Sequence, residues 1–291
     1  MRSLAPLHRR FLLIFIFCLI GVVLYSSSNK SLLRLPHVSS ERDHIWLIAT
    51  ISAARSQRRR NIIRATWQAS YQHPAIMTRF VISHPGNHWM PLIQHENATH
   101  GDIIMLPHLN ETAQVANTVK SIEFFKFLAS CGNSWEFVSK IDDDSYLDTR
   151  EFFEEFIKPL LENPQPKRTM IGRRLYHHNP DYEYAGGQFY TMSWDLISVF
   201  AQVYESDPIL NEHEDVLNGA LLHKAGASFN FVSLDNSKAF DYDNEQDDEY
   251  AWAHRIGEGA INPHKMKDDD TYLMVAEIFR HREHKSSVTY Y

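Results

Sequence analysis

The chain alternates apolar runs that are typical of buried strands with stretches whose apolar residues recur at helical spacing. Ile45 to Ile51 (IWLIATI) is a nearly continuous apolar run, which indicates a parallel strand covered on both faces. Further strands are expected over residues 76–83, 103–106, 135–141 and 170–171. Helices are expected over residues 61–70, 115–129, 149–160, 193–204 and 214–224.

The order of these elements predicts the fold class. Because strands alternate with helices of about 10–15 residues through the first half, we expect βαβ units and a mostly parallel central sheet flanked by helices, an α/β fold. The Pro-, Gly- and His-rich stretch after residue 83 and the polar, aromatic stretch from Arg173 to Gly187 are expected to be loops. No internal repeat or Pro/Ser-rich linker divides the body, so a single domain is the simplest prediction.

The N-terminus carries an apolar run from Phe11 to Tyr25, preceded by Arg2, Arg9 and Arg10. It is short for a full span, for which about 20 residues are typical, and a signal peptide cleaved near Ser26 is the alternative. We expect an uncleaved signal anchor, because the run is bulky and has no Ala-x-Ala ending. The predicted organisation is a cytosolic tail (1–10), a transmembrane anchor (11–25), a stem (26–43) and a lumenal domain (44–291).

Composition and charge are those of an ordinary globular protein, with 44% hydrophobic and 22% charged residues. The formal net charge of −7 gives no sign of a nucleic-acid binder. Two cysteines, Cys18 and Cys131, exclude a disulfide framework in the body. N-glycosylation triplets begin at Asn97 and Asn110, in agreement with a lumenal body, and a third begins at Asn29.

Three consecutive carboxylates, Asp142, Asp143 and Asp144, follow the strand expected at 135–141. Like charges this close repel one another unless a cation or solvent lies among them. Ligands gather at the carboxyl ends of strands in open α/β sheets, and carboxylate oxygens suit Mg²⁺ and Mn²⁺. Because side chains alternate along a strand, we expect Asp142 and Asp144 to share a metal and nucleotide face and Asp143 to point away. A solvated acidic turn is the alternative.

Five arginines crowd the loop and helix that follow the first strand. They are Arg55, Arg58, Arg59, Arg60 and Arg64. In an acidic protein such a cluster is a local anomaly, and its place beside a strand's carboxyl end and a helix N-terminus suits a phosphate-bearing ligand. A solvated basic face, or a patch held against an anionic membrane, would explain the same residues.

Two further motifs combine small, aromatic and acidic residues. Glu214 and Asp215 begin an apolar helix, where such a carboxylate serves either as a general base or only as a partner of the helix dipole. Gly186 and Gly187 permit close approach of backbone to a ligand, and Tyr184 beside them is a candidate for stacking on a sugar. A tight turn would explain the same glycines without a ligand.

The C-terminal quarter offers one candidate ligand and one acidic tract. His264 is a candidate metal ligand, although a lone histidine is more often an ordinary surface residue. The tract from Asp241 to Glu249 lacks the spacing of a calcium loop, so we expect it to be solvated surface.

Four motifs in order resemble the β-1,3-galactosyltransferase-like glycosyltransferases of family 31. They are RRNIIRATW at 59–67, FVSKIDDD at 137–144, YAGGQFYTMS at 184–193 and EDVLNG at 214–219. Any one is a weak signal, whereas four in order across about residues 45–225 are specific. The chain departs from the family's pattern in SYLD after the aspartates, in Leu-Asn after EDV and in lacking the usual disulfide cysteines, which indicates a distant branch.

The resemblance implies a GT-A fold, a UDP-sugar donor, a divalent cation (Mn²⁺ or Mg²⁺) and inversion at the anomeric carbon. It implies that Asp142 and Asp144 serve the ribose, diphosphate and metal. Asp215 would be the base that deprotonates the acceptor hydroxyl, and His264 a further metal ligand. The donor-binding set is expected to be Arg55, Arg60, Arg64, Asp142, Asp143, Asp144, Gly186 and Gly187, and the acceptor set Glu214 and Tyr184.

Together these features predict a membrane-anchored hexosyltransferase of the Golgi apparatus. It would move galactose, or another hexose or N-acetylhexosamine, from a UDP-sugar to a glycan, glycoprotein or glycolipid acceptor in β-1,3 linkage. A non-catalytic lumenal carbohydrate-binding protein on the same fold is the alternative. A glycoside hydrolase using two carboxylates is a third hypothesis, which gives the arginine-rich loop no purpose.

Overall fold

The computed structural model describes residues 45–112, 114–115, 118–132, 135–162, 168–206 and 212–288. The expected tail, anchor and stem over residues 1–43, and the triplet at Asn29, lie outside these residues and stay predictions. None of the helices in the described ranges is long and apolar enough to cross a membrane. All described residues belong to one compact unit, Arg42–Tyr291.

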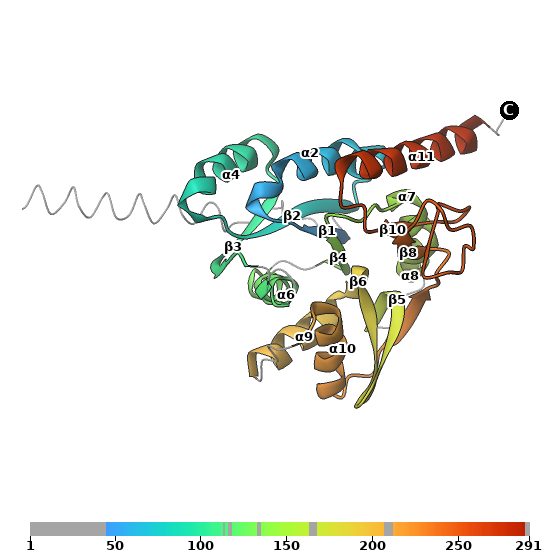
Figure 1. Ribbon diagram of the computed structural model, residues 1–291. Helices are drawn as coiled ribbons and strands as arrows, with labels where there is room; N and C mark the ends of the chain where they lie inside the picture. Colours follow the sequence, from blue (N-terminus) through green and yellow to red (C-terminus); the bar gives the residue numbers. More distant parts are fainter. Residues whose placement is uncertain are drawn as a thin grey trace, which may run out of the picture. The chain divides into compact units, whose positions relative to one another are not determined.

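The main sheet contains seven strands in the order β3-β2-β1-β4-β6-β5-β7 (Figure 1). Their bounds are β1 (Trp46–Ile51), β2 (Ile76–His84), β3 (Ile103–Asn110), β4 (Phe137–Asp142), β5 (Thr169–His178), β6 (Asp181–Ser193) and β7 (Asn230–Leu234). Neighbouring strands pair in parallel, except that β6 runs antiparallel to both β4 and β5. The predicted mostly parallel sheet is therefore confirmed.

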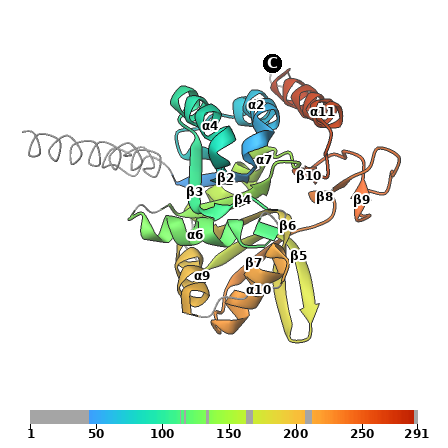
Figure 2. The same cartoon turned by 60° about the vertical axis from the view of Figure 1, so that its left-hand side comes forward.

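Helices cover both faces of this sheet. The two views in Figures 1 and 2 show α2 (Gln57–Ala65), α4 (Gly86–His100) and α11 (Asp269–Val288) on one side and α6 (Lys120–Ser130), α9 (Trp194–Ser206) and α10 (Glu214–Lys224) on the other. Shorter helical segments are η1 (Ala54–Ser56), α3 (Trp67–Ser70), α7 (Thr149–Phe152), η2 (Phe153–Ile157) and α8 (Lys158–Glu162). Cover on both faces explains why all six residues of β1 are buried and read as an apolar run.

A line of polar groups crosses the centre of the sheet. The indole of the fully buried Trp46 on β1 donates to Ser139 on β4 at 2.7 Å, and the hydroxyls of Ser139 and Thr191 on β6 lie 2.6 Å apart. Buried polar atoms are stable when they are paired in this way. The line fixes the register of β4, whose carboxyl end carries the three aspartates.

Two expected loops are regular elements instead. Residues 86–100 form α4, whose inward positions are Ile93 and the charged Glu96, so the segment shows no apolar stripe in the sequence. Residues 173–187 belong to the β5–β6 hairpin, whose outer half is exposed or half-buried and therefore polar. Both predictions of loop were wrong, because in each case contacts other than apolar burial hold the element.

A second, three-stranded sheet carries the C-terminal site residues. It consists of β8 (Ala239–Tyr242), β9 (Ala253–His254) and β10 (Asn262–His264) in the order β10-β8-β9. The expectation that the whole acidic tract is solvated is wrong for Asp241, which lies on β8 and is 6% exposed. Its neighbours from Asp243 to Glu249 are exposed.

Candidate active site

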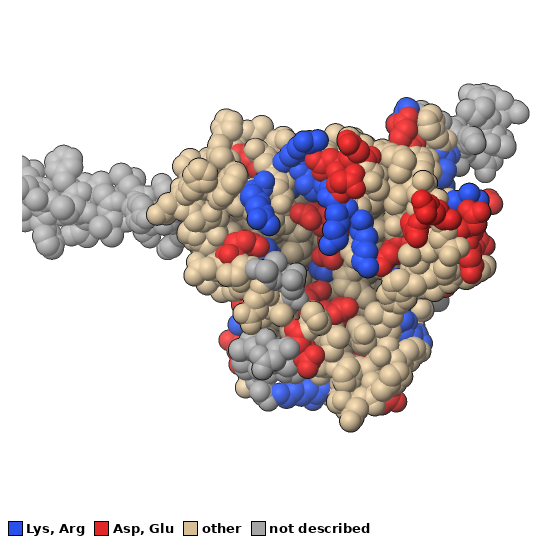
Figure 3. Space-filling view, in the orientation of Figure 1, with Lys and Arg blue, Asp and Glu red and all other residues tan. Residues whose placement is uncertain are grey.

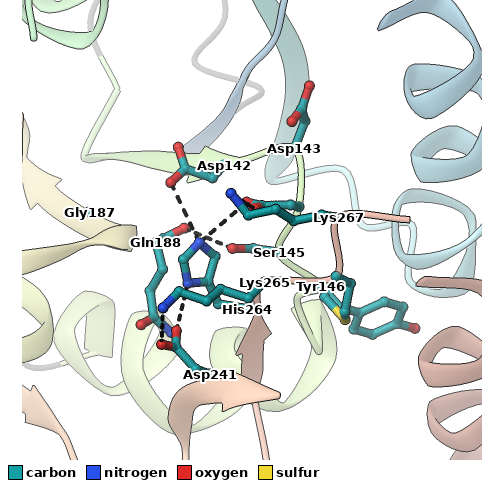
Figure 4. A network of polar contacts seen from close by, with 12 residues as sticks. Asp142, Asp143, Ser145, Tyr146, Gly187, Gln188, Asp241, His264, Lys265 and Lys267 are labelled. Atoms are coloured by element: carbon teal, nitrogen blue, oxygen red, sulfur yellow. Dashed lines mark hydrogen bonds and ion pairs between the residues drawn. The ribbon is translucent and has the colours of Figure 1, made fainter. Parts of the chain in front are cut away.

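The aspartate turn and the strand β10 are joined by backbone hydrogen bonds. Asp142 ends β4, and the turn through Asp144 begins with a bond from the Ser145 amide to the Asp142 carbonyl at 3.1 Å. The Met266 amide donates to the Asp144 carbonyl at 3.0 Å, just beyond His264. A residue that lies 120 positions further along the chain is thus held beside the aspartates (Figure 4).

Asp142, Asp144 and His264 converge on one point. Each offers a ligand atom, and these atoms all lie within 4.8 Å of one another. The His264 Nε2 is 3.3 Å from an Asp144 oxygen and 4.0 Å from an Asp142 oxygen. Two carboxylates and an imidazole are a donor set that suits a divalent cation such as Mn²⁺. The three residues therefore fit the divalent cation that the resemblance to family 31 implies.

Asp241 fixes the orientation of the histidine. Its Oδ1 lies 2.8 Å from the His264 Nδ1, which leaves Nε2 facing the two aspartates. Metal-ligating histidines commonly bond a carboxylate through the second ring nitrogen in this way. Although burial opposes it, hydrogen bonding to Asp144 and Asp241 raises the pKa of His264 to about 9. The carboxylates therefore draw positive charge to this point.

Asp143 turns from the other two aspartates toward β1. Its Oδ2 accepts a hydrogen bond from the Ser52 hydroxyl at 3.1 Å. Burial, with the neighbouring charge of Asp144, raises the pKa of Asp143 to about 6. Its side chain also lines the pocket described next, so its position suits both support of the turn and contact with a ligand.

A pocket of about 700 Å³ opens above the aspartates. Figure 3 shows acidic and basic side chains gathered around a hollow on one face of the protein. The pocket wall comprises residues 51–56, Pro85, Trp89, Glu111, Thr112, Lys120, Asp142, Asp143, Asp144, His264 and Lys267. Cations from three separate elements, Arg55, Lys120 and Lys267, thus face the same space as the carboxylates. This combination suits a ligand that carries phosphates and a bound cation.

Lys120 is an unexpected member of this wall. Its ammonium group is 1% exposed and bonds the Ser52 carbonyl at 3.1 Å and Glu111 at 2.7 Å. The helix expected over residues 115–129 contains Lys120 in its interior, and no local pattern marked this lysine as part of a pocket. Only the fold reveals that this lysine faces the aspartates across the pocket.

Lys140 connects the aspartates with the Glu214-Asp215 motif. Its ammonium group is 2.8 Å from Asp142 and 3.0 Å from Glu214, and it also donates to the Gly187 carbonyl. Although burial opposes it, the charges of Asp142 and Glu214 raise the pKa of Lys140. This lysine was missed, although a single cation inside the buried strand FVSKID was a usable signal.

Asp215 lies beside the glycine pair at the start of α10. A Cβ on Gly187 would lie 3.4 Å from the Asp215 Cβ and 3.2 Å from a Glu214 oxygen, so the absent side chain lets the helix approach β6. Burial and then the charge of Glu214 raise the pKa of Asp215. A raised pKa makes its ionised carboxylate a stronger base.

Steric crowding also explains why the last residue of the EDVLNG motif, Gly219, is a glycine. A Cβ on Gly219 would lie 2.6 Å from the Cβ of Tyr184 and 2.7 Å from the Glu183 carbonyl. Helix α10 therefore packs directly on the backbone of β6 at this turn. Tyr184 is half-buried and supports this contact, so the structure gives it a packing role besides the expected acceptor contact.

Two expected donor contacts do not fit the structure. Arg60 is fully buried and pairs with Glu96 at 2.6 Å, while Arg64 pairs with Glu96 at 2.8 Å and with Asp102 at 2.7 Å. These guanidinium groups hold α2 against α4 and do not line the pocket, although Arg60 donates to the Ala53 carbonyl from behind the pocket wall. Arg55 is exposed and lines the pocket, as a donor contact requires.

Arg59 has a different structural role from Arg60 and Arg64. Its guanidinium donates to the carbonyls of Asp143, Met266 and Lys267 at 3.2, 2.7 and 2.8 Å, and it pairs with Asp269 at 2.9 Å. These bonds hold the segment after His264 against the aspartate turn. Most of the arginine cluster thus supports the structure around the site and does not contact a ligand.

The remaining expected residues are placed as follows. The Glu214 side chain, expected to contact the acceptor, is 7% exposed and is occupied by Lys140 and the Tyr190 hydroxyl, so this expectation does not fit. Gly186 packs near Leu175, away from the pocket wall. Of the two glycosylation triplets, Asn110 is exposed at the end of β3, whereas Asn97 is half-buried in α4.

Comparison with known proteins places the chain among glycosyltransferases. It is 24% identical over 198 residues to probable beta-1,3-galactosyltransferase 4 of Arabidopsis thaliana, covering 57% of this chain and 46% of that protein. It is 25% identical over 158 residues to UDP-GlcNAc:betaGal beta-1,3-N-acetylglucosaminyltransferase 7 of Rattus norvegicus, covering 50% and 38%. The chain spans about half the length, or less, of these curated relatives.

Among solved structures, the galactosyltransferase LgtC with donor and acceptor sugar analogues aligns at a TM-score of 0.47 and 10% identity, over 81% of this chain and 94% of that one. This likeness is too loose to bear on function. The sequence profile of the family described as Galactosyltransferase matches residues 58–231, a span that includes Asp142, Asp144 and Asp215 but ends before His264. The chain therefore belongs to the galactosyltransferase family.

Proposed function

We propose that this protein is a metal-dependent, inverting hexosyltransferase. It transfers galactose, or another hexose or N-acetylhexosamine, from a UDP-sugar to a glycan acceptor in β-1,3 linkage. The observation that carries the proposal is the convergence of Asp142, Asp144 and His264 on the wall of a pocket lined by cations, in a chain of this family. The names of the relatives from Arabidopsis and rat support the linkage and the donor class.

The donor's parts correspond to distinct parts of the pocket wall. Asp142, Asp144 and His264 would hold Mn²⁺ or Mg²⁺, which offsets the charge that develops on the UDP leaving group. Arg55 and Lys267 are exposed or loosely paired cations at the pocket wall and suit the diphosphate. Trp89, also in the wall, offers an aromatic face to the uracil ring.

Asp215 is the proposed general base. The acceptor hydroxyl oxygen forms a bond to the anomeric carbon while the bond from that carbon to the UDP oxygen breaks, and the hydroxyl proton passes to Asp215. Lys140 holds Glu214 in place beside it through an ion pair of 3.0 Å, and Glu214 in turn raises the pKa of Asp215. The Asp215 carboxylate is thereby strengthened as a base.

The experiment is calorimetry of UDP binding with and without Mn²⁺, followed by a screen of UDP-sugars for Mn²⁺-dependent hydrolysis. Asp144→Asn should weaken Mn²⁺-dependent UDP binding by at least about 10–100-fold, the range known for residues that only orient metal ligands. Asp247→Asn is the control, because Asp247 is 73% exposed and far outside the pocket wall.

Wild-type protein that binds a glycan but no UDP in the presence of Mn²⁺ would show a carbohydrate-binding protein instead. Release of free sugar from a glycoside without any nucleotide would show a hydrolase. Either result would replace the transferase proposal.

We further propose a single-pass type II protein of the Golgi membrane with its active site in the lumen. The apolar run at 11–25 after basic residues supports this proposal, as do the triplets at Asn97 and Asn110.

A further inference from the structure

Trp252 is a large aromatic side chain that the protein leaves 52% exposed. It follows the acidic loop between β8 and β9 and lies outside the wall of the donor pocket. Tryptophan is highly buried on average, because its ring removes much apolar surface from water. An exposed indole that specific contacts hold in place is therefore a candidate for a binding role.

Two contacts hold the indole ring, and a third holds its backbone. The Arg173 guanidinium carbon lies 3.3 Å from the ring centroid, so it covers one face of the ring. The indole Nε1 donates to the Asp241 Oδ2 at 3.1 Å, and an Arg173 nitrogen donates to the Trp252 carbonyl at 3.3 Å. The exposed half of the side chain therefore presents the opposite ring face to solvent.

Arg173 has an unusual placement that this stacking explains. It is 3% exposed and lies where the register of β5 and β6 shifts between Gly172 and Arg174, a bulge that re-aims a side chain. No carboxylate of the described residues forms an ion pair with it, and its Nη1 has no hydrogen-bond partner there. Asn236 holds its other two nitrogens at 3.1 and 2.9 Å. A buried guanidinium with few partners is costly, and stacking on the Trp252 ring is one of the contacts that offset this cost.

Trp252 is linked to the proposed metal site through Asp241. Asp241 accepts from the indole with Oδ2 and contacts the His264 Nδ1 at 2.8 Å with Oδ1, so one carboxylate orients both rings. The indole thus shares a carboxylate with the metal-site histidine and lies outside the wall of the donor pocket.

We propose that Trp252 is the platform on which a pyranose ring of the acceptor glycan stacks. A pyranose has one face made of C–H groups, which packs on an aromatic ring, and a fixed ring loses little conformational freedom on binding. The acceptor class is then a neutral hexoside or N-acetylhexosaminide with an accessible C–H face, such as a β-galactoside. This inference rests on the proposed function, because it assigns the second substrate of the same site.

The test measures sugar binding directly. Saturation-transfer NMR with methyl β-D-galactoside and methyl N-acetyl-β-D-glucosaminide, in the presence of UDP and Mn²⁺, should show transfer to the C–H protons of one pyranose face. Trp252→Ala should weaken binding of that glycoside about 10-fold or more, as for an aromatic residue at the centre of an interface. Trp252→Phe, which keeps a ring over Arg173 but loses the donor to Asp241, should retain most of the binding.

Tyr176→Ala is the matched control, since Tyr176 is also 52% exposed but lies on the β5–β6 hairpin. It should leave glycoside binding unchanged. The Kd of UDP with Mn²⁺, measured on the Trp252 variants, separates this inference from the proposed function. If Trp252→Phe is as defective as Trp252→Ala and both weaken UDP binding, Trp252 only orients Asp241 and the platform is wrong. Unchanged glycoside binding in Trp252→Ala, or none in the wild type, would also overturn it.

Discussion

At the scale of single residues, the site depends on a chain of charges that crosses two sheets. Asp241 orients His264, His264 faces Asp142, and Lys140 joins Asp142 to Glu214 beside the proposed base. Each ionised group is stabilised by the next one, so the protonation state of one group depends on its neighbours. The pH dependence of activity measures how these charged groups affect one another.

The acid side of the pH profile should report Asp215. Burial and the charge of Glu214 raise its pKa, so it stays protonated up to a higher pH than an ordinary aspartate, for which about 3.9 is usual. A base must be ionised, and kcat/KM should therefore fall as pH drops through this raised value. The profile is measured at saturating Mn²⁺, and Asp215→Asn should lose activity at every pH.

A variant of His213, the N-cap residue of α10, tests the direction in which neighbouring charges shift the pKa of Asp215. The positive charge of His213, when protonated, lowers the pKa of Asp215. In His213→Gln the acid limb should therefore move to higher pH while the rate on the plateau is retained. An acid limb at the position of an unperturbed aspartate, unmoved by this variant, would exclude Asp215 as the base.

At the scale of secondary-structure elements, the arginine cluster shows what a sequence pattern can predict and what it cannot. Its position after β1 suggested a phosphate site, yet Arg60 and Arg64 turn inward to Glu96, a residue in a segment expected to be a loop. Sequence alone could not pair them, because a helix that buries an ion pair lacks the apolar stripe by which helices are identified. The strands β1 to β4 and helix α10 were predictable for the opposite reason, since apolar burial holds them.

Removal of the Glu96 carboxylate should loosen α2 from α4. Glu96→Gln leaves the fully buried Arg60 without a carboxylate, and breaking a buried pair costs about 3–5 kcal/mol of the free energy of unfolding. Urea denaturation at pH 7 measures this loss. Glu154→Gln, in an exposed pair with Lys158, should cost less than about 1 kcal/mol.

The effect of Glu96 should also depend on pH. Although burial opposes it, hydrogen bonds from Arg60 and the positive charge of its guanidinium lower the folded-state pKa of Glu96. Its contribution to stability is therefore present above the unfolded-state pKa, about 4.3, and is lost as pH falls through the lower folded value. The difference between wild type and Glu96→Gln should shrink toward acid pH. A difference that is constant with pH, or near zero at pH 7, would contradict an ionised pair.

At the scale of the whole molecule, the sequence predicts more of the active site than of its surroundings. Asp142, Asp144 and His264 were predictable as a metal set, through motif order and family resemblance, and they lie together. Lys140, Asp241 and Trp252 act through contacts between segments far apart in the chain. Their roles are therefore fixed by the three-dimensional arrangement and not by any local pattern.

The expected topology can be checked on the full chain expressed in a eukaryotic cell. Asn110 is exposed at the end of β3, so in a lumenal domain it should carry a glycan that peptide N-glycosidase removes, with a shift in gel mobility. Asn110→Gln should reduce the shift by one glycan, and the chain should stay with membranes in alkaline carbonate. A chain without any glycan that is extracted by carbonate would place the domain elsewhere.

The distance along the chain between Asp144 and His264 has a consequence for synthesis. The aspartates at the end of β4 emerge from the ribosome long before the segment after β10, whose Met266 amide donates a hydrogen bond to the Asp144 carbonyl. A nascent chain therefore holds three adjacent carboxylates with no histidine opposite them. The complete metal-ligand set, and with it any cleavage of a nucleotide sugar, arises only when translation of this domain is almost finished.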